Sequence, residues 1–172
     1  MSSNTPACAS RSLAEEVVKS LALRKKTIAA AESCTAGLVA DFIARVPGAS
    51  EVFWGSFVCY TADAKHRMLG VPRQLIEKYG AVSRPVALAM AEGALERSGA
   101  FWAFSVTGLA GPDGDGTNTP VGTVWIGIAG REEQPGSEAK KFLFSGSRNE
   151  VREAAAAAAL EELFERINRQ GY

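Results

Sequence analysis

Segments with strand character alternate with segments of helical character over the first two-thirds of this chain. The apolar stretch 26–32 and the aromatic-rich stretch 52–60 predict strands, and each precedes a stretch with helical character. The last two strand-like segments, 121–129 and 140–144, are joined by the polar turn 131–138, which is too short for a helical crossover. This order predicts a mixed sheet between helix layers whose last two strands are antiparallel.

Helices are predicted where apolar residues recur at helical spacing or where proline suits a first turn. The second helix is expected to begin at Ser33 and to end at Pro47-Gly48. Three alanines in 26–32 leave a helix open as the alternative there. The remaining predicted elements are a first helix carrying Leu13, Val17, Val18 and Leu21 on one face, helices at 61–69, 72–79 and 85–98, a strand at 101–106, and a last helix with Leu160, Leu163, Phe164 and Ile167 on one face.

Length, charge and residue usage restrict the classes of protein that remain. The 172 residues suit a single domain over 1–172, with residues 1–9 expected to be frayed. Equal numbers of basic and acidic residues, 19 and 19, argue against nucleic acid as the main partner. No uncharged stretch reaches the roughly 20 apolar residues of a membrane span, and the first residues lack signal-peptide features, so a cytoplasmic protein is expected. Three cysteines without CxxC spacing and one histidine make a metal site unexpected.

The first candidate site is the stretch 31–37, where a strand is followed directly by a predicted helix start. Hydroxyls of Ser33 and Thr35 at such a position lie beside unpaired backbone N–H groups, which favour an anion or a developing oxyanion. The simpler alternative is that Ser33 only caps the helix, a contribution of about 1 kcal/mol. Taken alone, this segment does not decide between the two.

The second candidate site is the stretch 60–66, which again follows a strand. A lysine in a partly dry environment loses ammonium character, so Lys65 would be able to act as general base to a serine hydroxyl. His66 is its immediate neighbour and would point away from it in either regular structure, so only one of the two is expected to face a pocket. The alternative is that both are solvated surface residues.

The third candidate is the glycine-rich loop 107–120. Its glycines expose backbone N–H groups suited to polar ligand edges, but it matches neither a P-loop nor a dinucleotide-binding fingerprint. A long surface loop explains the same composition. Arg148 and Arg152, at the start of the last helix, are candidates to pair with a phosphate or are simply solvated charges.

Taken together, five ordered motifs resemble the C-terminal domain of the competence/damage-inducible protein CinA, a family that includes free-standing nicotinamide-nucleotide amidases. The resemblance covers the chain from about residue 12 to its end. The motifs are AESCTAGL at 31–38, FWGSFVCYTADAKHRMLGV at 53–71, GAVSRPVALAMAEGA at 80–94, TGLAGPDGDGTNTPVGTV at 107–124 and GSRNEVR at 146–152.

The resemblance implies a three-layer α/β/α domain with a mixed, mostly parallel sheet, commonly a homo-oligomer. It also implies hydrolysis of the carboxamide of nicotinamide mononucleotide to nicotinate mononucleotide and ammonia, with a pyridine nucleotide as small-molecule partner and without cofactor, metal, nucleic acid or membrane. Ser33 would then be the nucleophile, and Lys65 and Tyr60 would take its proton and organise the pair. The implied substrate-binding residues are Thr35, Gly37, Thr107, Gly108, Gly111 and Arg148.

Three positions differ from the usual wording of the family. Ala36, Ser56 and Ser147 stand where glycine, glycine and aspartate are usual. The methyl group of Ala36 is expected to narrow the turn or oppose a positive φ. Two alternatives stay open: Cys34 as nucleophile, because a thiol at a helix start can have a depressed pKa, and a nucleotide-binding module without turnover.

Overall fold

The computed structural model describes residues 6–131 and 136–169, and its centre is a five-stranded sheet of order β2-β1-β3-β4-β5. The three strands β2, β1 and β3 are parallel, whereas β4 runs antiparallel to both of its neighbours, β3 and β5. This confirms the mixed sheet and the antiparallel final pair. The strands are β1 (Ile28–Glu32), β2 (Phe53–Val58), β3 (Trp102–Gly108), β4 (Thr123–Gly130) and β5 (Glu138–Leu143).

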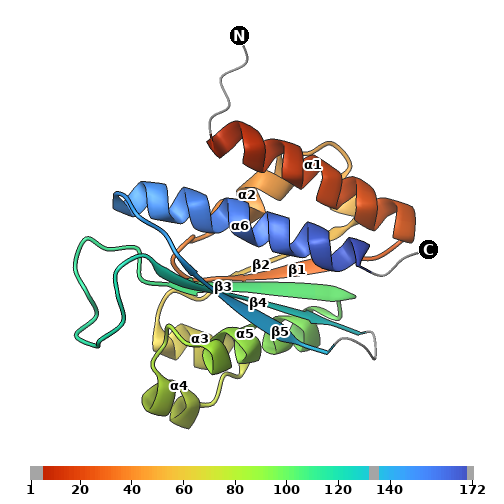
Figure 1. Cartoon of the computed structure of the whole chain (residues 1–172). Coiled ribbons are helices and arrows are strands. Elements are labelled where there is room, and N and C mark those ends of the chain that lie inside the picture. Colours follow the sequence, from red (N-terminus) through yellow and green to blue (C-terminus); the bar gives the residue numbers. More distant parts are fainter. Residues whose placement is uncertain (1–5, 132–135, 170–172) are drawn as a thin grey trace.

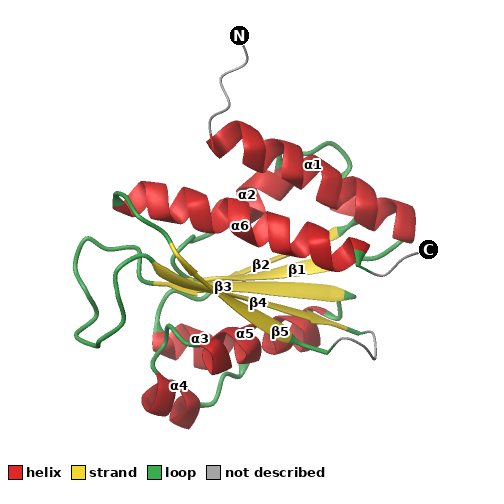
Figure 2. Cartoon of the chain, viewed as in Figure 1, coloured by secondary structure: helices red, strands yellow, loops and turns green. Residues whose placement is uncertain are grey.

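Helices cover both faces of the sheet, as Figures 1 and 2 show. One layer contains α1 (Pro6–Arg24), α2 (Leu38–Ala44) and α6 (Arg148–Asn168); the other contains α3 (Ala62–Leu69), α4 (Arg73–Tyr79) and α5 (Arg84–Ser98). A 3₁₀ turn, Ala49–Glu51, precedes β2. None of the helices in 6–131 and 136–169 has both the length and the hydropathy needed to cross a bilayer.

The central strand β1 shows why the fold needs two helix layers. All five of its residues are buried, because side chains alternate between the faces of a strand and both faces are covered. Ile28 and Ala30 belong to the core under α1, α2 and α6, and Ala29 and Ala31 to the core over α3 and α5. Four of the five side chains are apolar, and the fifth, Glu32, is a buried carboxylate at the end of the strand.

Three helix boundaries differ from the predictions by more than one residue, and one of them is the end of α2, which lies at Ala44 and not at Pro47-Gly48. Helix α1 begins at Pro6, so residues 6–9, expected to be frayed, lie in its first turns, whereas 1–5 lie outside the described residues. Helix α2 begins at Leu38 and not at Ser33. The reason lies in the turn before α2, where Ala36 and Gly37 have φ of 52° and 94°, which a right-handed helix does not allow.

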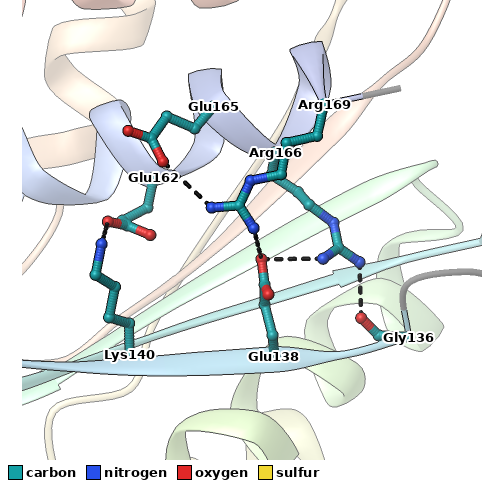
Figure 3. A network of polar contacts seen from close by, with 7 residues as sticks. All are labelled: Gly136, Glu138, Lys140, Glu162, Glu165, Arg166 and Arg169. Atoms are coloured by element: carbon teal, nitrogen blue, oxygen red, sulfur yellow. Dashed lines mark hydrogen bonds and ion pairs between the residues drawn. The ribbon is translucent and has the colours of Figure 1, made fainter. Parts of the chain in front are cut away.

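Helix α6 is joined to β5 by a network of charged side chains (Figure 3). Arg166 is almost fully buried, and its guanidinium donates 2.7 Å to the Gly136 carbonyl and lies 2.9 Å from Glu138. Lys140 of β5 pairs with Glu162 of α6 beside it. These contacts fix the second half of α6 on the sheet, and the other end of the same helix carries Arg148 and Arg152.

Candidate active site

A serine hydroxyl and a lysine amine meet where β1 and β2 end. Lys65 Nζ lies 2.8 Å from Ser33 Oγ, although the two residues are 32 positions apart in the chain. Both side chains are buried, with Lys65 only 2% exposed. Ser33 Oγ also lies 3.5 Å from the carbonyl oxygen of Tyr60. The parallel pairing of β1 with β2 brings the two strand ends to the same edge of the sheet.

The local structure around α3 orients the Lys65 side chain toward Ser33. The Thr61 side chain accepts a hydrogen bond from the Ala64 N–H and caps the N-terminus of α3. Lys65 lies in the first turn of this helix, and its side chain extends back over the end of β2. The carbonyl of Cys59 accepts a second hydrogen bond from Lys65 Nζ at 3.1 Å. His66 faces the other way, with Nδ1 2.9 Å from the Val71 carbonyl. The two neighbours therefore point in different directions, as expected, and Lys65 is the one that contacts Ser33.

Burial changes the acid–base chemistry of Lys65. Loss of solvation lowers its pKa below the ordinary 10.5, and the nearby thiols of Cys59 and Cys34 oppose this effect only in part. A neutral amine has a lone pair that can accept the proton of the Ser33 hydroxyl, while one of its own N–H groups still donates to Cys59. The pair thus has the geometry and the electrostatics of a nucleophile beside its general base.

The turn 33–37 is held from behind by the carboxylate of Glu32. One oxygen accepts the N–H groups of Gly37 at 2.9 Å and Val39 at 3.2 Å, and the other accepts the N–H of Ala40 at 2.9 Å. The same carboxylate accepts the Ser56 hydroxyl at 3.3 Å. A buried carboxylate must be compensated by such donors, and here they are the unpaired N–H groups at the start of α2.

Ala36 occupies a backbone conformation that favours glycine. Its φ of 52° lies in the left-handed region, where a Cβ atom costs about 1 kcal/mol or more. The methyl group therefore does not prevent the positive φ, but it strains the turn that follows Ser33.

We expect Ala36→Gly to raise the free energy of unfolding by about 0.5–1 kcal/mol, because relief of strain exceeds the entropy that glycine adds to the unfolded chain. Urea denaturation measures the change. Ala157→Gly, in the interior of α6, is the matched control and should lower stability by about 1 kcal/mol. A loss of stability in Ala36→Gly comparable to the control would contradict the strain argument.

A pocket of about 190 Å³ opens beside Ser33. Its wall combines the end of β3, the glycine-rich loop, Tyr60 and the first residue of α6. The guanidinium of Arg148 donates to the Gly111 carbonyl and to the Tyr60 hydroxyl, which joins these three parts. The lining residues are Ser33, Cys34, Tyr60, Gly108, Leu109, Ala110, Gly111, Asp113 and Arg148.

The other proposed site residues lie outside the lining of this pocket. The Thr107 hydroxyl donates 2.8 Å to the Ala81 carbonyl and so ties β3 to the segment before α5. Thr35 is fully buried, and its hydroxyl has no hydrogen-bond partner among the described residues. The N–H of Gly37 is occupied by Glu32. Lys65 lies behind Ser33 and contacts it without lining the pocket.

Burial also bears on Cys34, the alternative nucleophile. Loss of solvation raises the pKa of its thiol to about 11, in spite of the opposing effect of Lys65. The helix start expected to lower this pKa lies farther along the chain, because α2 begins only at Leu38. Cys34 is therefore a protonated thiol near neutral pH, and the geometry favours Ser33.

Sequence reasoning missed two charged residues of this region. Glu32 carried a signal, since a carboxylate ending an otherwise apolar strand must find buried donors. Asp113 carried none, because acidic residues are ordinary in glycine-rich surface loops. Arg152, considered as a phosphate partner, instead donates to backbone carbonyls of the turn that follows Ser33.

Comparisons with known proteins agree on one family. A model described as the CinA C-terminal domain matches residues 10–167. A protein from Symbiobacterium thermophilum named putative competence-damage inducible protein is 50% identical over 154 residues, which cover 86% of this chain and 36% of that protein. A CinA-like protein from Anaeromyxobacter sp. is 47% identical over 151 residues, covering 88% and 36%. The chain spans little more than a third of the length of these curated relatives.

Solved structures show the same fold. A competence/damage inducible protein from Agrobacterium tumefaciens matches with a TM-score of 0.87 and 38% identity, covering 93% of this chain and 96% of that one. A competence-damaged protein (CinA) superfamily protein from Escherichia coli matches with a TM-score of 0.88 and 30% identity, covering 96% and 94%. The three-layer arrangement expected from the sequence is thereby confirmed.

Proposed function

Because the chain belongs to the CinA C-terminal domain family, we propose that it hydrolyses the carboxamide of nicotinamide mononucleotide to nicotinate mononucleotide and ammonia. The observation that carries the proposal is the buried 2.8 Å contact between Lys65 Nζ and Ser33 Oγ at the wall of a pocket. Amide hydrolysis needs an activated nucleophile and donors for the tetrahedral oxyanion. Ser33, beside Lys65, is the candidate nucleophile, and a backbone N–H of the turn that follows it is the candidate donor.

In the proposed reaction, Ser33 Oγ attacks the carboxamide carbon while its proton passes to Lys65 Nζ. The backbone N–H of Cys34 follows Ser33 directly, and among the described residues no backbone carbonyl accepts it, so it is the candidate donor to the oxyanion. Collapse of the intermediate breaks the C–N bond, and Lys65 returns the proton to the leaving ammonia. The oxygen of a water molecule then attacks the ester carbon while Lys65 accepts the proton of that water. The C–O bond to Ser33 breaks, the proton returns from Lys65 to Ser33 Oγ, and the released acid ionises to the carboxylate product.

The charges of the pocket support a pyridine nucleotide. Arg148 uses two of its N–H groups within the protein, which leaves donors for a phosphate. Asp113 lines the same pocket and has no hydrogen bond or ion pair among the described residues. A ligand with a cationic ring and an anionic phosphate matches one acidic and one basic lining residue. Nicotinamide mononucleotide has this distribution of charge.

We expect Asp113→Asn to raise KM for nicotinamide mononucleotide about 2- to 5-fold with kcat unchanged, because an exposed carboxylate contributes at most about 1 kcal/mol to a charge pair. Steady-state ammonia release at low and high salt measures the effect, which salt should weaken. Asp115→Asn, on the same loop but outside the pocket lining, is the matched control. An unchanged KM in Asp113→Asn would remove this residue from substrate recognition.

The direct test is ammonia production from nicotinamide mononucleotide, its riboside and the dinucleotide. We expect ammonia release from the mononucleotide and none from the riboside, which lacks the phosphate. Calorimetric binding of the mononucleotide without ammonia release would instead indicate the nucleotide-binding module and overturn the proposed reaction.

A further inference from the structure

Arg152 reaches across from the first turns of α6 to the turn that carries the nucleophile. Its Nε donates 3.0 Å to the carbonyl of Cys34, and its Nη2 donates 3.0 Å to the carbonyl of Thr35. The remaining Nη1 donates 3.2 Å to the side chain of Asn149. All three nitrogens of one guanidinium are thus engaged, and two of them hold consecutive carbonyls directly after Ser33.

Together with other hydrogen bonds, these contacts hold the turn 33–37 from several sides. The Ser33 N–H donates 2.9 Å to the Val106 carbonyl, and Glu32 accepts the N–H groups at the far end of the turn. Among the described residues, no side chain other than Arg152 donates to the carbonyls of Cys34 and Thr35. Because each peptide unit is planar, fixing a carbonyl also fixes the N–H on its opposite side. Arg152 therefore sets the orientation of the backbone that follows Ser33.

The turn requires such support because it is strained. Ala36 has φ of 52°, and a free turn would relax toward a more common conformation. Any relaxation would move Ser33 Oγ relative to Lys65 Nζ, which comes from a different element and would not follow. Arg152 lies outside the lining of the pocket, so its contribution does not pass through contact with a ligand there.

We propose that Arg152 is a positioning residue for the hydrolysis proposed above, on which this inference rests: its guanidinium fixes the turn that aligns Ser33 with Lys65. A lysine cannot replace it, because a single ammonium lacks the planar fork that spans two adjacent carbonyls.

The test compares Arg152→Ala and Arg152→Lys with the wild-type protein. Displacement of a reacting atom by about 1 Å costs on the order of 100-fold, so we expect kcat for nicotinamide mononucleotide to fall about 10- to 100-fold in both variants with KM within about twofold. Ethylguanidinium added to Arg152→Ala should restore part of kcat. Asn149→Ala, which removes only the third contact of Arg152, is the matched control and should retain wild-type kcat.

A second measurement does not depend on the substrate. A fluorophosphonate probe forms an Oγ–P bond to an activated serine and releases fluoride, and intact mass reports the labelling rate. We expect Ser33 of wild type to be labelled, and Arg152→Ala, with circular dichroism matching wild type, to be labelled about 10-fold more slowly. Labelling of this kind without ammonia release would overturn the substrate but support the positioning role. Equal labelling rates in the two proteins, no labelling of wild type, or a rise in KM with unchanged kcat would overturn the role of Arg152.

Discussion

Replacement of Ser33 by alanine is expected to lower ammonia release from nicotinamide mononucleotide by at least about 1,000-fold, because residual binding and oxyanion donors cannot replace the attacking oxygen. The fold should tolerate the change. Within 6–131 and 136–169, the Ser33 hydroxyl forms hydrogen bonds only with Lys65 Nζ and the Tyr60 carbonyl, so its loss should cost about 1 kcal/mol of stability. Coupled assay of ammonia, with thermal unfolding of the same preparation, measures both quantities.

Cys34→Ala supplies the matched control for this experiment. The Cys34 thiol lies beside the same pocket, but burial raises its pKa to about 11, so the thiolate required for attack is scarce at neutral pH. We expect Cys34→Ala to retain most of the wild-type kcat. The opposite pattern, with activity lost in Cys34→Ala and kept in Ser33→Ala, would assign the nucleophile to the thiol.

The order of strands and helices was predictable because each element carries its own periodicity and its own breakers. The short turn between the last two strands excluded a helical crossover, and β4 and β5 are antiparallel as a result. Neighbouring side chains diverge on a helix, which was sufficient to expect that Lys65 and His66 face different surroundings. These features depend on local geometry alone.

The parts that could not be predicted depend on contacts between distant segments or on backbone conformation. Arg152 and Cys34 are 118 residues apart in the chain, and Arg148 and Tyr60 are 88 apart, so no local pattern relates them. The start of α2 at Leu38 follows from left-handed φ angles at Ala36 and Gly37, and alanine does not signal such a conformation. Sequence thus indicates candidate site residues but not how the turn 33–37 is supported.

Replacement of Lys65 by methionine should lower activity without lowering stability. We expect ammonia release to fall by at least about 1,000-fold, since the base that accepts the Ser33 proton is removed. The free energy of unfolding near neutral pH should be unchanged or raised by up to about 2 kcal/mol, because an apolar side chain of similar length needs no solvation in this buried position. Urea denaturation measures the stability.

The dependence of this stability difference on pH follows from the direction of the Lys65 pKa shift. The pKa in the folded protein lies below the ordinary 10.5, so between the two values the unfolded chain binds more protons than the folded one. Wild-type stability should therefore rise with pH through that window relative to Lys65→Met, and the advantage of the variant should be largest below the folded-state pKa and shrink toward pH 10.5. Wild-type kcat/KM should rise with pH through the same lowered pKa, as the amine becomes neutral.

Denaturation series from about pH 6 to about pH 10 on wild type, Lys65→Met and Lys78→Met distinguish this linkage from general effects of removing a charge. Lys78 is exposed on α4, so its replacement should leave the stability difference nearly independent of pH over this range. If the difference for Lys65→Met is equally flat, Lys65 keeps an ordinary pKa in the folded protein. It would then be fully protonated at neutral pH and unable to accept the proton of Ser33, and the base in the proposed reaction would have to be a different group.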